Sequence, residues 1–404
     1  MKRRTYAYVW WALLSAVALL LAACSGGDGP GRAGQRPTGA APTDAGSSSA
    51  PRIPSGTGLP GWSHSVGFAA DGSGFTLLAT CPEDDARPEE GCTQDVAVLD
   101  KGASSWRLAA ESPIPGTRPP DGVTAGLIVL GPGRALITEG LRSEGDRTWF
   151  TRDGGRTWKE GRAEPAGTIA SVPKGAPLLD DCVRMDREGN GCERSRLVTV
   201  LPDTGQYRAL AHQPALKGWR RPAGEPAENM LCASGTDPKS GLPTLATSED
   251  RGRTWHVGHM TGPAKDGWGF SVVAGRGGTY AVQSGGLPLA EKVKNGLLAI
   301  HASSDGGYTW TRVWEYRKGV EPLSVLGAPV AALDHSLTVY GEHGVWRSTD
   351  GARGFTRVEG TEGPSGSVEP TPIGYLWSSS FGQGSYRISA DGTHWHAFEL
   401  GGPS

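Results

Sequence analysis

An eight-residue motif of the form S/T-x-D-x-G-x-T-W recurs in this 404-residue chain and constrains the fold more than any other feature. The best copies span residues 151–158, 248–255 and 303–310. The Asp can accept backbone N–H bonds in a turn, the Gly can adopt a left-handed conformation, and the Thr then starts a strand. The motif therefore predicts a local hairpin. Its defining positions are Asp153, Gly155, Trp158, Asp250, Gly252, Trp255, Asp305, Gly307 and Trp310.

Degenerate copies extend the pattern along the chain, beginning at Asp100, Asp203, Asp350 and Asp391. The seven copies end in aromatic residues at positions 106, 158, 207, 255, 310, 355 and 395, which are 40 to 55 residues apart. Each interval is long enough for four short strands and their turns. The 62 Gly and 30 Pro residues also indicate many short segments separated by turns. We therefore predict an all-β fold, a β-propeller of seven four-stranded blades over residues 61–404, with six or eight blades as alternatives.

The motif is similar to the Asp-box, and the chain resembles the BNR or Asp-box β-propellers over nearly all of this region. That family includes sialidases, sortilin-type receptors, photosystem II assembly factors and some xyloglucanases. The resemblance implies that the boxes are structural hairpins at the periphery of the blades. It does not select one activity, because a single fold can carry unrelated functions.

The N-terminus has the order of a secretory signal. The basic run Lys2-Arg3-Arg4 precedes an uncharged, apolar stretch from Thr5 to Ala23. A transmembrane anchor of that length is the alternative. The sequence Leu21-Ala22-Ala23-Cys24 resembles the lipobox of bacterial lipoproteins, which implies cleavage before Cys24 and lipidation of its thiol. We predict a signal peptide at residues 1–23 and a lipid anchor at Cys24 on the extracytoplasmic face of the cell membrane.

Residues 24–60 resemble a linker. Only Ile53 and Leu59 in it are large and apolar, so the segment has little surface to bury and is expected to be disordered. As a flexible coil it would span roughly 30–35 Å. It would tether the folded part to the membrane.

Two pairs of cysteines fit an oxidising compartment. Cys81 and Cys92 are 11 residues apart, and Cys182 and Cys192 are 10 apart. Each pair brackets a polar, loop-like stretch, so we predict two local disulfides rather than metal ligation. Cys232 lies in an apolar run and is expected to be a buried free thiol. We predict no metal site and no cofactor, although His394 and His396 are two residues apart, a spacing that could hold a metal.

A sialidase is the sharpest enzymatic hypothesis. Those enzymes begin with an aromatic-Arg-Ile-Pro motif whose Arg holds the substrate carboxylate, and Pro51-Arg52-Ile53-Pro54 matches three of its four residues. Asp84 or Asp85 would be the acid. Arg347, Arg387, Tyr375 and Tyr386 could complete the site, although nothing in the sequence singles them out. The motif, however, lies in the linker and lacks its aromatic residue.

The preferred interpretation is that the protein is a binding module. Losing the signal peptide changes the formal net charge from −2 to −5, which argues against nucleic acid as a partner. Trp219 and Trp268 flank loops and would mark a binding face if exposed near the axis. We therefore predict a monomeric, membrane-anchored propeller that binds a protein or carbohydrate ligand without catalysis, with an exported sialidase-like glycoside hydrolase as the alternative.

Overall fold

The computed structural model describes residues 50–81, 91–117, 123, 125–139, 147–187, 191–361, 365–379 and 384–402. Residues 48–404 form one compact unit. Within the described residues the only helical element is the short 3₁₀ turn η1 (Leu289–Glu291), and no helix there is long and apolar enough to cross a membrane. The predicted signal peptide and Cys24 lie outside the described residues.

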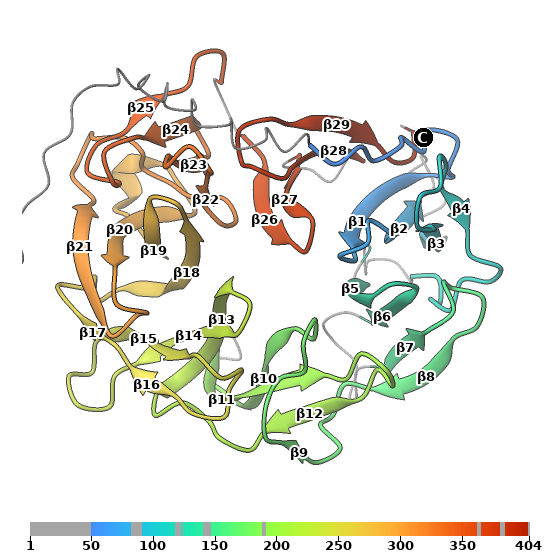
Figure 1. Ribbon diagram of the computed structural model, residues 1–404, viewed down its shortest axis with the longest axis horizontal. Coiled ribbons are helices and arrows are strands. Elements are labelled where there is room, and N and C mark those ends of the chain that lie inside the picture. Colours follow the sequence, from blue (N-terminus) through green and yellow to red (C-terminus); the bar gives the residue numbers. More distant parts are fainter. Residues whose placement is uncertain are drawn as a thin grey trace, which may run out of the picture. The chain divides into compact units, whose positions relative to one another are not determined.

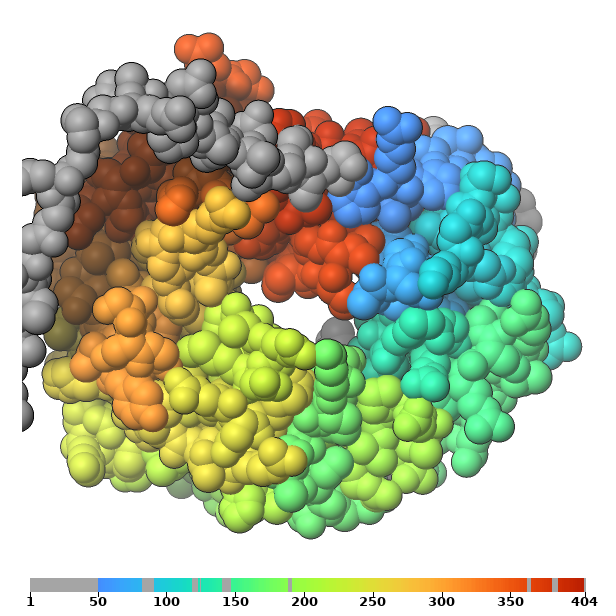
Figure 2. Space-filling view, viewed as in Figure 1, coloured from blue at the N-terminus to red at the C-terminus, as the bar shows by residue number. Residues whose placement is uncertain are grey.

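Seven sheets radiate around a central opening, as Figures 1 and 2 show, so the prediction of a seven-bladed, all-β propeller is confirmed. Blades 1 and 2 contain β1 (Trp62–Phe68), β2 (Gly74–Thr80), β3 (Thr93–Leu99), β4 (Arg107–Leu108), β5 (Gly126–Gly131), β6 (Arg134–Thr138), β7 (Arg147–Thr151) and β8 (Lys159–Arg162). Blades 3 and 4 contain β9 (Thr168–Ile169), β10 (Leu178–Met185), β11 (Cys192–Val200), β12 (Tyr207–Leu210), β13 (Lys217–Ala227), β14 (Met230–Thr236), β15 (Pro243–Ser248) and β16 (His256–Val257).

The remaining blades follow the same plan. Blade 5 contains β17 (His259–Met260), β18 (Gly267–Gly275), β19 (Gly278–Gly285), β20 (Gly296–Ser303) and β21 (Thr309–Glu315). Blades 6 and 7 contain β22 (Val330–Ala331), β23 (Leu337–Gly341), β24 (Gly344–Ser348), β25 (Thr356–Arg357), β26 (Ser367–Thr371), β27 (Gly374–Ser378), β28 (Ser385–Ser389) and β29 (His396–Glu399).

Two blades use a strand from the preceding connection at their outer edge. In blade 3, β9 pairs in parallel with β12, giving the order β10-β11-β12-β9. In blade 5, β17 pairs in parallel with β21 and adds a fifth strand to the sheet. The other ladders within the blades are antiparallel. The extra strands therefore cover outer edges that would otherwise present unpaired backbone groups.

Antiparallel pairing separates the connections onto two faces of the disc. Residues 286–295, which join β19 to β20, and residues 316–329, which join β21 to β22, lie at one end of the blade 5 strands, here called the loop face. The connections that carry the repeated motif, such as residues 151–158, lie at the other end, the motif face. The end of β10 and the start of β11 lie on the loop face, because β11 runs from there toward the degenerate motif copy at Asp203.

The three best motif copies form the hydrogen-bonded turn that their residues predict. In the copy at residues 248–255, Ser248 Oγ donates to Asp250 Oδ1 at 2.8 Å. Gly252 N donates to Ser248 Oγ at 2.7 Å, and Thr254 N and Oγ1 donate to the Asp250 carboxylate at 2.9 and 2.6 Å. The copies that begin at Thr151 and Ser303 make the same bonds. The carboxylate therefore accepts hydrogen bonds from backbone N–H groups that have no backbone acceptor in the turn.

The motif also joins neighbouring blades. A Cβ atom added at Gly252 would lie 2.9 Å from Leu210 Cδ2 of blade 3, and one added at Gly307 would lie 2.6 Å from Thr247 Oγ1 of blade 4. Trp310 is fully buried in an apolar cluster with Leu245 of blade 4. Each of these copies thus packs against the blade before it, where only a glycine leaves enough room.

The ring closes through the segment before blade 1. Ile53 is 4% exposed and packs with Phe398 and Leu400 of blade 7. Gly56 N donates to the carbonyl oxygen of Glu399 at 2.7 Å, and Glu399 N donates to Ser55 Oγ at 3.1 Å. This segment therefore lies along the end of β29, and it fills the gap between the last blade and the first.

The folded part consequently begins before residue 61, the boundary expected from composition. The linker was expected to have nothing to bury, but Ile53 finds an apolar site between blades 1 and 7. One buried side chain and several backbone bonds are enough to order a segment that composition alone describes as a coil.

Candidate functional site

Strands β10 and β11 of blade 3 and the innermost strand of blade 4, β13, bring a cluster of arginine and tryptophan side chains to the loop face near the axis. We call it the arginine cluster; it consists of Arg184, Arg194, Arg196, Trp219, Arg220 and Arg221 with the carboxylates Asp180, Asp181 and Glu193. The side chains come from β10, β11 and the first half of β13. Five cations and three carboxylates make this region basic, in contrast to the chain as a whole.

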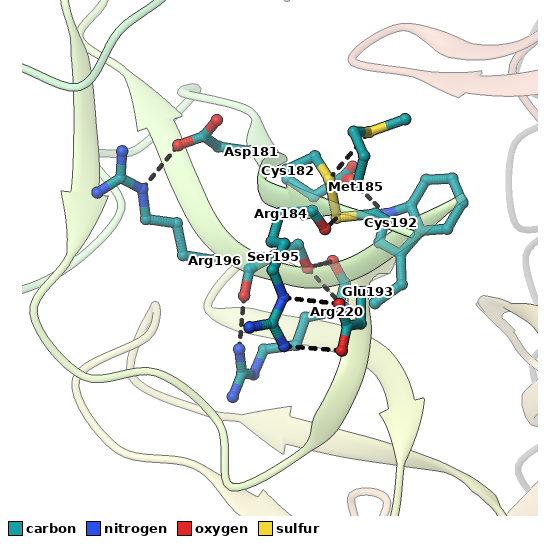
Figure 3. The surroundings of a disulfide bond; sticks show 11 residues. Asp181, Cys182, Arg184, Met185, Cys192, Glu193, Ser195, Arg196 and Arg220 are labelled. Atoms are coloured by element: carbon teal, nitrogen blue, oxygen red, sulfur yellow. Dashed lines mark hydrogen bonds and ion pairs between the residues drawn. A yellow bond between two sulfur atoms is a disulfide. The ribbon is translucent and has the colours of Figure 1, made fainter. Parts of the chain in front are cut away.

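The Cys182–Cys192 disulfide holds the hairpin between β10 and β11 and confirms the predicted pairing. Figure 3 shows this bond with its surroundings. The guanidinium of Arg184 pairs with Glu193 at 2.6 Å across the hairpin, and that of Arg196 pairs with Asp181 at 2.6 Å. These two cations are therefore compensated.

Trp219 and Arg221 form a stacked pair on β13. The Arg221 guanidinium carbon lies 3.5 Å from the centre of the Trp219 ring, which is cation–π geometry. Trp219 Nε1 donates to Asp180 Oδ2 at 2.6 Å, and Arg221 Nη1 donates to the carbonyl oxygen of Trp268 at 2.7 Å. The pair thus bridges blades 3, 4 and 5.

Arg220 is fixed to blade 3 through Ser195. Arg220 N donates to Ser195 Oγ at 2.7 Å, and its Nη1 donates to the Ser195 carbonyl oxygen. Burial lowers the pKa of Arg220, and the positive charge of Arg194 lowers it further. Burial also lowers the pKa of Arg221. Partial burial therefore disfavours the charged form of both side chains.

Within the part of the chain that the structure describes, Arg194, Arg220 and Arg221 form no ion pair, and Nε of Arg220 and of Arg221 is buried without a hydrogen-bond partner. Even partial burial of a cation is unfavourable when no counter-charge accompanies it. An anionic group that reached these guanidinium groups would supply the missing charge and acceptors. The cluster is therefore suited to bind an anion.

Part of this site could be predicted from the sequence. Trp219 and Trp268 were expected to mark a binding face, and the Trp268 side chain is 50% exposed on the loop face. The arginines were not singled out. The run Trp219-Arg220-Arg221 and the spacing of Arg194 and Arg196 are visible in the sequence, but their convergence depends on how β13 packs against β11.

Of the residues proposed for a sialidase, those that the structure describes do not gather at the axis. The Ile53 carbonyl oxygen lies 3.3 Å from His396 Nε2 on the outermost strand of blade 7, so the neighbouring Arg52 lies exposed at the rim. Asp84 and Asp85 lie outside the described residues, although the predicted Cys81–Cys92 disulfide that brackets them is present.

The other residues considered for that site have structural partners. Arg347 pairs with Asp334, and Arg387 lies over the Trp377 ring at 4.7 Å. Tyr375 Oη donates to the Ala331 carbonyl oxygen at 3.1 Å. Tyr386 is buried against Ser63, and burial raises its pKa to about 12. None of these contacts assembles a nucleophile.

The paired histidines also bind other groups. His394 Nδ1 lies 2.7 Å from Asp391 Oδ2, and His396 contacts Ile53 as described above. Among the described residues, no group of three or more His, Cys, Asp or Glu side chains is placed to hold a metal ion.

Comparison with known proteins bears on the fold. Neither a protein-family model nor a protein of curated function matches the sequence. Similar solved structures include the Penicillium chrysogenum α-L-arabinanase complexed with arabinobiose, at 10% identity and a TM-score of 0.37 over 86% of this chain and 98% of that one. YCF48 bound to D1 peptide is 12% identical, with a TM-score of 0.30 over 85% and 82% of the two chains.

A third structure, the Niastella koreensis GH74 enzyme, is 14% identical with a TM-score of 0.33. The match covers 83% of this chain and 54% of the GH74 enzyme, so this chain spans about half of that enzyme's length. The class that the fold defines is the seven-bladed β-propeller, and function must be argued from the site itself.

Proposed function

We propose that this protein is a membrane-anchored, extracytoplasmic propeller that binds an anionic protein or glycan through the arginine cluster and does not catalyse a reaction. The proposal rests on one observation. Arg220 and Arg221 hold half-buried positive charge near the axis of the disc, and neither they nor the neighbouring, exposed Arg194 form an ion pair among the described residues. A ligand carboxylate, sulfate or phosphate would complete the site.

The anchor and the location are proposed from the N-terminal sequence. A basic run, an apolar stretch and the Leu21-Ala22-Ala23-Cys24 sequence support lipidation of Cys24 after export. The two disulfides support export, because such bonds persist outside the reducing cytosol.

Binding can be tested with the full-length protein in detergent micelles. Calorimetric titration with polygalacturonate and with poly-L-glutamate should give saturable binding, and titration with neutral dextran should not. The two anionic polymers separate a glycan from an acidic polypeptide as the preferred ligand class. Affinity should fall with salt, because the contacts are ionic.

Two variants make the assignment specific. Arg194→Gln combined with Arg221→Gln should weaken binding by at least about tenfold, the size expected for losing a charged hydrogen bond. Arg152→Gln changes an exposed arginine on the motif face and should bind as the unmodified protein does. Equal affinity of all three proteins would refute the site. Turnover of a fluorogenic sialoside or an aryl glycoside would instead support the glycoside hydrolase alternative.

A further inference from the structure

Blade 5 carries a second surface on the loop face that combines exposed apolar side chains with unpaired lysines. We call it the blade 5 patch and define it by Trp268, Leu289, Val320, Lys265, Lys292 and Lys318. Trp268 lies at the start of β18, and the other residues come from the three connections that meet at this end of the blade. The arginine cluster adjoins this patch but shares none of its side chains.

The apolar members are unusually accessible. The Leu289 side chain is 96% exposed on the 3₁₀ turn η1, Trp268 is 50% exposed and Val320 is 45% exposed. A single exposed apolar side chain is ordinary, but a group on neighbouring loops marks an interaction surface. Leu289 follows Pro288 at the tip of its connection, where nothing in the described chain covers it.

The three connections are in contact. Tyr316 Oη donates to Glu291 Oε1 at 2.7 Å and joins the turn that carries Leu289 to the segment that carries Val320. The Trp268 ring lies 4.0 Å from the position of a Cβ atom at Gly286, on the same connection as Leu289.

The lysines of the patch lie on connections that hold more basic than acidic side chains. Lys265, Lys292 and Lys318 form no ion pair among the described residues. Glu291 accepts the Tyr316 bond, and Glu342 accepts backbone N–H bonds from Lys294 and Asn295 at 2.9 and 2.8 Å. One exposed carboxylate, Asp266, adjoins Lys265. The connections 261–266, 286–295 and 316–329 together hold five basic and three acidic side chains, so this end of the blade carries a small net positive charge.

From these observations we infer that the blade 5 patch docks on an anionic lipid bilayer. Lysines bind acidic head groups, and tryptophan and leucine side chains enter the interfacial region. This inference rests on the proposed anchor, which would keep the propeller near the membrane. The 28 residues between Cys24 and Ile53 would span roughly 30 Å as a coil. The tether would therefore keep the patch at a high effective concentration near the bilayer, so that even a weak affinity of the patch for lipid is sufficient for docking.

Docking would also place the proposed ligand site near the membrane. The carbonyl oxygen of Trp268 accepts a bond from Arg221, so the patch and the arginine cluster share a border. A docked propeller would present that cluster to anionic ligands at the membrane surface.

Hydrogen exchange on the full-length lipidated protein tests this inference. Amides of residues 286–295 and 316–322 should exchange at least about tenfold more slowly on vesicles of phosphatidylglycerol and phosphatidylcholine than in detergent. On phosphatidylcholine alone the protection should be weaker. Equal exchange in anionic vesicles and detergent would overturn the inference.

A matched pair of variants identifies the side chain. Leu289→Asp should abolish the protection, and it should fold normally because that side chain is exposed. Leu333→Asp, at a 45% exposed position on the motif face, should keep the protection. Unchanged protection in Leu289→Asp would contradict docking through blade 5. Failure of the anchor itself is distinguishable, because mass spectrometry would then show an unmodified Cys24.

Discussion

Trp106 Nε1 donates a hydrogen bond of 2.8 Å to the carbonyl oxygen of Pro54, and this bond joins blade 1 to the segment that completes the ring. Blade 4 shows the same relationship, since Trp255 Nε1 donates to the carbonyl oxygen of His212 in the connection before that blade. Residues 53–56 therefore take the place of an ordinary connection between blades. The linker-like N-terminal segment is a structural part of the propeller.

Removing the Ile53 side chain should destabilise the whole ring. Ile53→Ala leaves a cavity between blades 1 and 7, and such changes cost about 2–5 kcal/mol. Chemical denaturation of the full-length protein should show a correspondingly lower free energy of unfolding. Arg52→Ala, at the exposed neighbouring position, should stay within about 0.5 kcal/mol. Equal effects would mean that Ile53 does not close the ring.

The motif carboxylates should make stability depend on pH in the acid range. Hydrogen bonds from Thr309 lower the pKa of Asp305 from 3.8 to about 2 in the folded protein. Its contribution is therefore complete above pH 4 and is lost as the pH falls toward 2. Asp305→Asn should lower the melting temperature most at neutral pH, with a smaller difference near pH 2. Asp266→Asn, at an exposed position, should show no such trend.

The glycines of the motif should differ in how much a substitution destabilises the protein, because some are closely packed and others are not. Gly102 and Gly205 both have positive φ, 69° and 68°. An added Cβ would meet nothing within 4 Å at Gly102, but at Gly205 it would lie 2.5 Å from Phe150 Cγ of the preceding blade. Gly102→Ala should cost only about 1–2 kcal/mol for the left-handed backbone. Gly205→Ala should cost clearly more in denaturant unfolding; similar costs would argue against tight packing there.

The Cys182–Cys192 disulfide should support both stability and ligand binding. Replacing both cysteines by serine should lower the free energy of unfolding by about 2–3 kcal/mol, from the length of the closed loop. It should also weaken binding of polygalacturonate or poly-L-glutamate, because this hairpin carries part of the arginine cluster. Loss of stability with unchanged binding would show that the hairpin does not position that cluster.

Cys232 should be inert in the folded protein. It is fully buried, and burial raises its pKa to about 12, so that very little thiolate forms at neutral pH. Iodoacetamide should leave it unmodified under native conditions and modify it after unfolding, as mass spectrometry of its peptide will show. Rapid native labelling would contradict this assignment.

The fold was predictable because its signal is local. Each motif copy, such as Ser303 to Trp310, contains the donors and acceptors of its own turn, and repetition supplied the blade count. The disulfides were equally local, since their cysteines flank one hairpin each. The parallel edge strands β9 and β17 were not predictable, because two residues of strand in a connection leave no periodic pattern.

The candidate site was predictable only in part because its contacts cross between blades. Arg220 meets Ser195 and Trp219 meets Asp180 through the packing of β13 against blade 3, and sequence spacing does not encode that packing. Ile53 was missed for a related reason. Part of its apolar environment comes from residues more than three hundred positions away, at the end of the chain.

The closure of the ring has a mechanical consequence. The proposed lipid anchor lies on the N-terminal side of Ile53, so any pull between membrane and propeller is delivered to the segment that holds blade 7 against blade 1. The bonds between Gly56 and Glu399 and the buried Ile53 side chain would bear that load first. A force applied through the anchor would thus act on the contact between blades 1 and 7. The strength of that contact would limit the force that the attached protein can withstand.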